Sequence, residues 1–168
     1  MGKLSDLGIV TTTPDRLDAI NDTGRTAYCG PFVISAITGF PISRIEREIV
    51  AFRREADGPK GRVRGTTTEE VRSALQHFGY EMIERANYTE RPRKERPSVW
   101  LWMQRPRQPF SYYILAIHKG KEGHWIVIKG AKASDTFSEG RWGFVCDGPH
   151  KGAKIMEVYE VRRAVMAS

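Results

Sequence analysis

The stretch YCGPFVISAITG, residues 28–39, decides the fold and gives the first indication of chemistry. Pro31 suits the first turn of a helix, because its φ is already helical and its missing N–H is not needed there. Apolar residues follow at helical spacing, and Gly39 with Pro41 after it predicts the end of the helix. The sequence therefore places Cys29 at the N-terminus of a short apolar helix.

A cysteine in this position is a candidate nucleophile. The thiolate is the reactive form, and both the unpaired backbone N–H groups and the dipole at a helix N-terminus favour a negative charge. The same N–H groups can stabilise an oxyanion, and Gly30 is expected to leave room for a substrate carbonyl. Cysteine is also among the most buried residue types, so packing is the alternative role for Cys29.

A histidine that could act as the base begins a buried strand far downstream. The apolar run Trp125–Ile128 is bounded by glycines and predicts a strand with His124 at its start. Phe110–His118 predicts the preceding strand, joined to it by a hairpin connection at 119–123. His118 ends that strand, so it is a rival to His124 for the role of base.

A third strand is predicted over Arg141–Cys146, and it ends in the turn Asp147-Gly148-Pro149. A carboxylate bonded to an imidazole fixes its tautomer and stabilises the imidazolium, so Asp147 is predicted to orient the histidine. Asp before Gly-Pro is also a common turn residue, which is the alternative. Cys146 lies inside the strand and is predicted to be a core thiol.

With these features the chain resembles the papain-like cysteine peptidases, most closely those that cut after double-glycine leaders in bacteriocin export and their free-standing relatives. The resemblance covers about residues 23–152, and its matching pieces are Cys29-Gly30-Pro31, Gly65 to Tyr80, His124 to Val127, and Asp147-Gly148-Pro149. It implies a papain-like fold, a thiol-dependent hydrolase that cleaves a peptide or isopeptide bond, a peptide or protein substrate, and often small residues such as paired glycines before the cut.

The sequence departs from this family at the oxyanion site. Papain-like enzymes usually carry a glutamine several residues before the cysteine, and here Asn21 is the only nearby amide. Asn21 and Gly30 are therefore the candidates for oxyanion binding, with Trp125 for substrate binding. The missing glutamine keeps open a catalytically inactive papain-like scaffold that binds protein or nucleic acid. The same apparatus also serves acyl transfer and deamidation.

The remaining segments predict an α+β fold. Helices are expected over Pro41–Arg54 and from Thr67 or Thr68 to Phe78, and strands over Tyr80–Glu84 and Lys154–Arg162. Residues 1–168 are expected to form a single papain-like domain, with 1–20 as an N-terminal lead-in. The nucleophile then lies in an N-terminal helical half that packs on a C-terminal antiparallel sheet.

Charge and composition limit the kinds of binding partner that the chain is expected to have. The 168 residues include 27 Lys and Arg against 20 Asp and Glu, a net charge of +7 that favours polyanions. The basic residues concentrate at Arg91–Pro97 and Arg105–Arg107, on either side of Trp100 and Trp102. Because no nucleic-acid readout motif accompanies them, solvated loops are favoured over a nucleic-acid site. The small size and positive charge also suit a phage or mobile-element protein.

No metal or other cofactor is expected, because the two cysteines are far apart and no Cys-x-x-Cys or His-x-x-x-His pair occurs. His77 and His150 are expected to be surface or helix residues without a partner. The N-terminus lacks an apolar signal segment and no apolar run is long enough to span a membrane, which favours a reducing, cytoplasmic location. The sequence does not indicate an oligomeric state.

Overall fold

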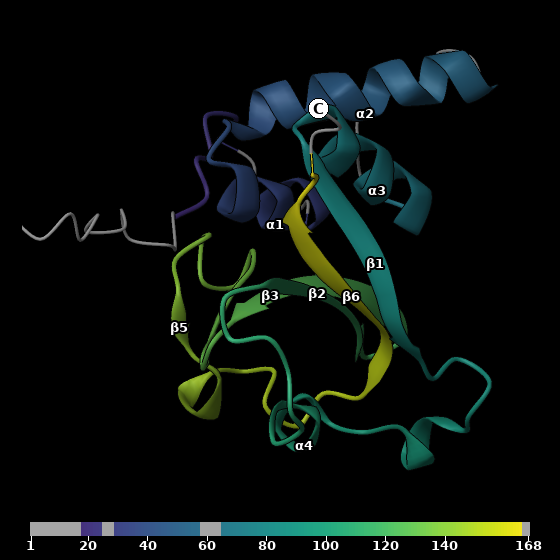
Figure 1. Ribbon diagram of the computed structural model, residues 1–168, viewed down its shortest axis with the longest axis vertical. Helices are drawn as coiled ribbons and strands as arrows, with labels where there is room; N and C mark the ends of the chain where they lie inside the picture. Colours follow the sequence, from purple (N-terminus) through teal and green to yellow (C-terminus); the bar gives the residue numbers. More distant parts are fainter. Residues whose placement is uncertain (1–17, 25–28, 58–64, 166–168) are drawn as a thin grey trace, which may run out of the picture.

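The computed structural model describes residues 18–24, 29–57 and 65–165, in which three helices precede a six-stranded antiparallel sheet and a fourth, short helix lies between its first two strands in the chain (Figure 1). The helices are α1 (Cys29–Thr38), α2 (Ile42–Asp57), α3 (Thr68–His77) and the short α4 (Val99–Met103), with 3-10 turns η2 (Arg93–Glu95) and η3 (Val145–Asp147). The strands are β1 (Tyr80–Asn87), β2 (Tyr112–Lys119), β3 (Glu122–Lys129), β4 (Lys132–Ser134), β5 (Gly143–Phe144) and β6 (Ile155–Arg163).

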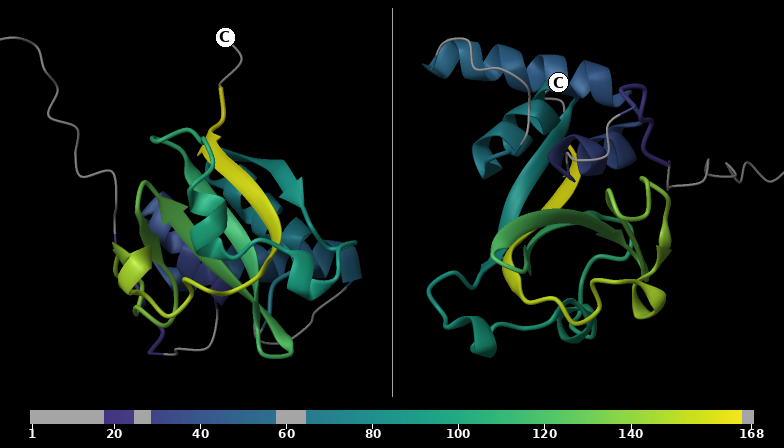
Figure 2. Two further views of the ribbon diagram at one scale, coloured as in Figure 1. Left: turned by 90° about the horizontal axis from the view of Figure 1, so that it is seen from below. Right: turned by 180° about the vertical axis from the view of Figure 1, so that it is seen from behind.

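The sheet has the order β1-β6-β2-β3-β4-β5, and every neighbouring pair is antiparallel. Helices α1 to α3 lie together on one side of it, and α4 lies on the other side (Figures 1 and 2). The predicted α+β class, with a helical N-terminal half and a C-terminal antiparallel sheet, is confirmed. Most of the predicted lead-in lies outside the described residues. Of its described part, Ala19 donates to Gly140 O at 3.0 Å.

Helix α1 begins at Cys29, as the position of Pro31 predicts, and ends where Gly39 adopts a left-handed φ of 76°. The N–H of Gly39 donates to Ser35 O at 2.8 Å and closes the last turn. Residues 30–37 are all buried, so α1 is enclosed on every side. This surrounding protein fixes the start of the helix, and Cys29 with it.

Helices α2 and α3 lie where the sequence predicts them. An ion pair between Arg53 and Glu70 joins the two helices. Thr67 caps α3, because its side chain accepts the N–H of Glu70 at 3.2 Å. Arg53 of α2 lies 2.6 Å from the buried Glu70 and also donates to Gly65 O. This pair holds the segment just before α3 in place.

The strands bury alternate residues on the two faces of the sheet. One face packs against α1 to α3 through side chains from four strands, namely Tyr80, Met82, Ile114, Ala116, Trp125, Val127, Tyr159 and Val161. The other face packs against the region of α4 through Tyr113, Leu115, Ile117, Ile126, Ile128, Ile155 and Val158. Full burial of such a side chain contributes about 1.5–3 kcal/mol to the free energy of folding. The central strands, which bury side chains on both faces, therefore stabilise the sheet most.

The segment after β3 differs from the prediction. The strand expected over Arg141–Cys146 is reduced to β5 and followed by η3, while β4 was not anticipated. Cys146 is exposed, because only Val145 of this turn faces the core, so the prediction of a core thiol is wrong. Trp102 of α4 is buried, whereas Trp100 is 41% exposed. None of the described helices is both long and apolar enough to cross a membrane.

Candidate active site

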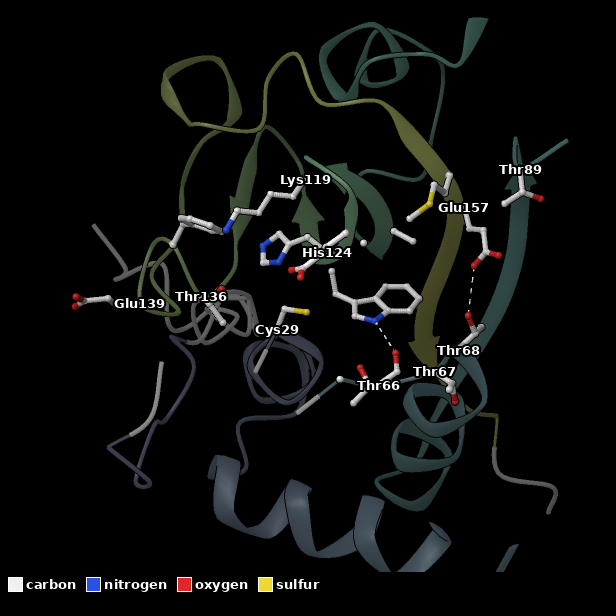
Figure 3. A pocket seen from close by; sticks show the side chains of 17 residues that line it. Cys29, Thr66, Thr67, Thr68, Thr89, Lys119, His124, Thr136, Glu139 and Glu157 are labelled. Atoms are coloured by element: carbon white, nitrogen blue, oxygen red, sulfur yellow. Dashed lines mark hydrogen bonds between the residues drawn. The ribbon is translucent and has the colours of Figure 1, made fainter. Parts of the chain in front are cut away.

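A cleft of about 1170 Å³ opens between α1, the segment before α3 and the central strands β6, β2 and β3. Cys29 lines it from the first turn of α1, and His124 and Trp125 line it from β3 (Figure 3). Thr66 forms part of one wall, and its carbonyl accepts the indole N–H of Trp125 at 3.3 Å. The cleft thus brings together the predicted nucleophile and the predicted base.

Cys29 and His124 both line the cleft, and each shifts the pKa of the other. Burial raises the pKa of the Cys29 thiol, but the bonds from His124 and from the backbone N–H of Trp125 outweigh it and hold the pKa below its ordinary value. Burial lowers the pKa of His124, yet its bonds to Asp135 and Cys29 outweigh this and raise the pKa to about 9. The two shifts together favour a thiolate beside an imidazolium.

Asp135 is the carboxylate that holds His124. Its Oδ2 lies 2.7 Å from Nε2 of His124, and both side chains are buried. Because a carboxylate only accepts, Nε2 of His124 carries a proton and Nδ1 is left to face Cys29. Burial raises the pKa of Asp135, but the bonds from His124 and His150 outweigh it and bring the pKa below its usual range.

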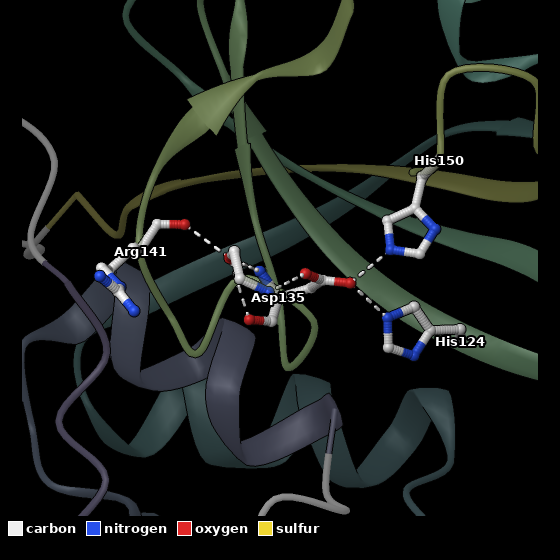
Figure 4. A network of polar contacts seen from close by, with 5 residues as sticks. His124, Asp135, Arg141 and His150 are labelled. Carbon is white, nitrogen blue, oxygen red and sulfur yellow. Dashed lines mark hydrogen bonds and ion pairs between the residues drawn. The ribbon is translucent and has the colours of Figure 1, made fainter. Parts of the chain in front are cut away.

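A tight turn after β4 fixes Asp135 (Figure 4). Its Oδ1 accepts the N–H of Ser138 at 3.1 Å, and its own N–H donates to Ser138 Oγ at 3.2 Å. The hydroxyl of Ser138 bonds in turn to the carbonyl of Arg141 at 2.6 Å, and Gly140 N–H donates to Asp135 O at 2.8 Å. The carboxylate therefore reaches His124 from a rigid loop.

A second histidine shares the same carboxylate oxygen. His150 Nε2 lies 2.5 Å from Asp135 Oδ2, so the expectation that His150 lacks a partner is wrong. The ring of Phe137 packs edge-on against both imidazoles at 5.2 Å, and Lys119 Nζ lies 3.6 Å from the centre of that ring. Phe137 is half-exposed and lines the cleft, so it covers the two histidines on the solvent side.

The structure gives the carboxylate position to Asp135 in place of Asp147. Asp147 is exposed in η3, where the chain turns outward before His150. His118 contacts Arg96 through its ring, and burial together with Arg93 and Arg96 lowers its pKa. His118 is not among the residues that line the cleft, and His124 is the histidine that meets Cys29.

Of the residues predicted to bind the oxyanion or the substrate, Trp125 lies in the cleft, Asn21 lies outside it and Gly30 is buried beside Thr66. Trp125 lines the cleft as expected. Asn21 is exposed and does not line it, because its side-chain oxygen accepts the N–H of Thr23 at 3.1 Å in a local turn. Gly30 is buried, and a Cβ placed on it would lie 2.1 Å from Thr66 Oγ1. The side of Gly30 on which a Cβ would lie is therefore filled by Thr66 and leaves no room for a substrate.

His77, the other histidine expected to lack a partner, lies 3.4 Å from Glu48. It is half-exposed on α3 and is separate from the cleft lining.

His124, Asp135 and His150 also form the kind of cluster that can hold a metal ion, with ligand atoms within 4.8 Å of one another. The two nitrogens lie 2.7 and 2.5 Å from one carboxylate oxygen, which are hydrogen-bond distances. Ligands of one tetrahedral zinc ion lie about 3.3 Å apart, since each bond is about 2.0–2.1 Å. These distances therefore fit two hydrogen bonds to Asp135 better than the coordination of one metal ion.

No protein-family model matches the chain, and no curated protein matches it in sequence. Among solved structures the chain is similar to the peptidase domain of Streptococcus ComA, a bi-functional ABC transporter involved in a quorum sensing pathway. The identity is 14% and the TM-score is 0.49, with 89% of this chain and 98% of that chain covered. The chemistry proposed for this protein rests on the geometry of Cys29, His124 and Asp135.

Proposed function

We propose that this protein is a papain-like cysteine peptidase with Cys29 as nucleophile, His124 as acid and base, and Asp135 as the residue that orients the imidazole. The observation that carries the proposal is that one cleft brings together the Cys29 thiol, at the start of a buried helix, and the His124 imidazole, which is bonded to the buried Asp135 carboxylate. The opposed pKa shifts of Cys29 and His124 support an active enzyme over an inert scaffold.

Acylation follows from this arrangement. The Cys29 thiolate attacks the carbonyl carbon of the peptide bond, and the carbonyl electrons move to its oxygen. When that oxyanion re-forms the carbonyl, the C–N bond breaks and the amine leaves with the proton of the His124 imidazolium. The products of this step are a thioester on Cys29, a neutral His124 and a free amine.

Deacylation uses the same residues in reverse. Neutral His124 takes a proton from a water molecule, whose oxygen attacks the thioester carbonyl. The C–S bond then breaks and releases a carboxylic acid, and the thiolate–imidazolium pair is restored. An amine in place of water gives acyl transfer, and a substrate side-chain amide in place of the peptide bond gives deamidation.

Backbone groups at the start of α1 support the oxyanion in this proposal. No glutamine precedes Cys29 at the position of the papain-like pattern, and Asn21 is engaged elsewhere. Apart from Pro31, which has none, the first residues of α1 have N–H groups without a partner inside the helix, and in this proposal these groups donate to the oxyanion.

A mixture of many peptides tests the proposal even though the natural substrate is not identified. The protein is incubated with a digest of mixed proteins, and new peptide ends are identified by mass spectrometry. We expect cleavages that disappear with Cys29→Ala and persist with Cys146→Ala, since Cys146 is exposed in η3. Cleavage that survives Cys29→Ala, or no cleavage together with an unreactive Cys29, contradicts the proposal.

A further inference from the structure

Three glutamates line the cleft that contains Cys29, namely Glu122, Glu139 and Glu157, and Glu157 lies on β6. In Figure 3 the side chain of Glu157 points toward Thr68, and the dashed line between them marks their hydrogen bond. A β-bulge aims Glu157 into this space. Ile117 of β2 pairs with Ile155 and Ala116 pairs with Glu157, so Met156 is an extra residue, and both Met156 and Glu157 line the cleft.

Two hydroxyl groups hold this carboxylate by one oxygen. Tyr159 donates to Oε2 at 2.9 Å, and Thr68 Oγ1 donates to the same atom at 3.3 Å. Burial and the Glu157 carboxylate raise the pKa of Tyr159 to about 12, so the phenol remains a donor. Within the described chain Oε1 accepts no hydrogen bond from the protein, which leaves it available to a ligand.

No cation among the described residues pairs with Glu157. The guanidinium of Arg72 lies 5.7 Å from the ring centre of Tyr159, which donates to Glu157, but Arg72 forms its ion pair with Glu69. Glu84 adds a second negative charge near Tyr159. Lys119, which also lines the cleft, is associated with Phe137 beside the histidines. The end of the cleft at Glu157 is therefore negative, although the chain as a whole carries a net charge of +7.

We propose that Glu157 binds a lysine side chain of the substrate, so that the peptidase selects peptides with a lysine close to the scissile bond. This inference rests on the proposed function. A concave, partly desolvated carboxylate without a counter-ion attracts a cation. An ammonium group suits it better than a guanidinium, because bidentate binding of arginine needs both carboxylate oxygens and Oε2 is already occupied by two hydroxyls.

Thiol-directed peptide chloromethyl ketones test this selection. Three tripeptide probes carry lysine at the first, second or third residue from the reactive group, and three matched probes carry uncharged norleucine there. The rate of Cys29 modification is measured by mass spectrometry. At one position we expect lysine to react about tenfold faster than norleucine, the effect of one charge-assisted hydrogen bond. Glu157→Gln should reduce the ratio of the lysine rate to the norleucine rate to about one. Glu157→Lys should react faster with a probe that carries glutamate at the same position than with the lysine probe.

Two controls separate the outcomes. Glu122→Gln removes another carboxylate that lines the cleft, and it should leave the lysine preference unchanged. Iodoacetamide, which carries no side chain, reports the Cys29–His124 pair alone and should react equally fast with the wild type and Glu157→Gln. Slow reaction with iodoacetamide overturns the proposed function. Fast reaction with no lysine preference at any position, or a preference that survives Glu157→Gln, overturns only the assignment of Glu157.

Discussion

Nε2 of His124 lies 2.7 Å from Oδ2 of Asp135, and this contact joins the start of β3 to the residue that follows β4. It determines the chemistry of the histidine, because a buried imidazole alone is neutral at physiological pH. With Asp135 and Cys29 as partners, the pKa of His124 rises to about 9 instead. The imidazolium is then available to protonate a leaving amine.

The pH dependence of kcat/KM should be bell-shaped. The acidic limb rises as pH passes through the pKa of Cys29, which lies below its ordinary value, because the thiolate is the nucleophile. The alkaline limb falls as pH passes through about 9, because His124 then loses the proton that the leaving group needs. Initial rates of peptide cleavage from pH 4 to 10 measure both limbs, and an alkaline limb near pH 6.5 contradicts this account.

Asp135→Asn should lower kcat/KM by about 10²–10⁴, because a neutral amide lacks the negative charge with which the carboxylate stabilises the imidazolium. The pKa of His124 should fall, so the alkaline limb should move to lower pH. Asp147→Asn is the matched control, because Asp147 is exposed and separate from His124. Equal losses in the two variants, measured with the same peptide, are inconsistent with the role of Asp135.

His150 should act as a positioning residue through Asp135. His150→Ala removes the second donor to Oδ2 and should lower kcat/KM about tenfold, as loss of a supporting hydrogen bond typically does. His150→Gln keeps an N–H donor and should restore most of the rate. His77→Ala serves as control, since His77 pairs with Glu48 away from the cleft. If kcat/KM is the same in His150→Ala and His150→Gln, the hydrogen bond to Asp135 does not account for the loss of rate.

Gly30→Ala should destabilise the protein by about 1–3 kcal/mol in the free energy of unfolding, the usual cost of overpacking. The added Cβ would lie 2.1 Å from Thr66 Oγ1 and 2.7 Å from its Cγ2. Adding Thr66→Ala should recover part of the loss. Gly148→Ala is the control, because its Cβ meets nothing nearer than Phe144 O at 3.5 Å. Urea unfolding measures all four proteins, and unchanged stability in Gly30→Ala shows that this contact is not tight.

The elements with strong local patterns could be predicted from the sequence. Pro31 and Gly39 bound α1, and the apolar run after His124 forms β3 within one or two residues. These patterns depend on neighbours along the chain, so they hold before any tertiary contact is known. Cys29 and His124 could be singled out as candidates for the same reason, since each lies at the end of such an element.

Asp135 could not be found in this way. It follows a strand of three residues, Lys132–Ser134, which is too short to show alternation. Only the antiparallel register, with Val127 opposite Ser134, brings the following turn beside His124. Asp147 had the more familiar local signal, a turn tripeptide. The same limit applies to Glu157, because the bulge that aims it into the cleft arises from pairing between β2 and β6.

The most direct test of the thiolate–imidazolium pair is the rate of alkylation of Cys29 by iodoacetamide from pH 4 to 9, with each modified residue identified by mass spectrometry. The exposed Cys146 is the internal reference in the same molecule. We expect Cys29 to react well below pH 8 and faster than Cys146, and His124→Ala to abolish this difference. A Cys29 that reacts no faster than Cys146 at any pH contradicts the assignment of this site as a peptidase centre.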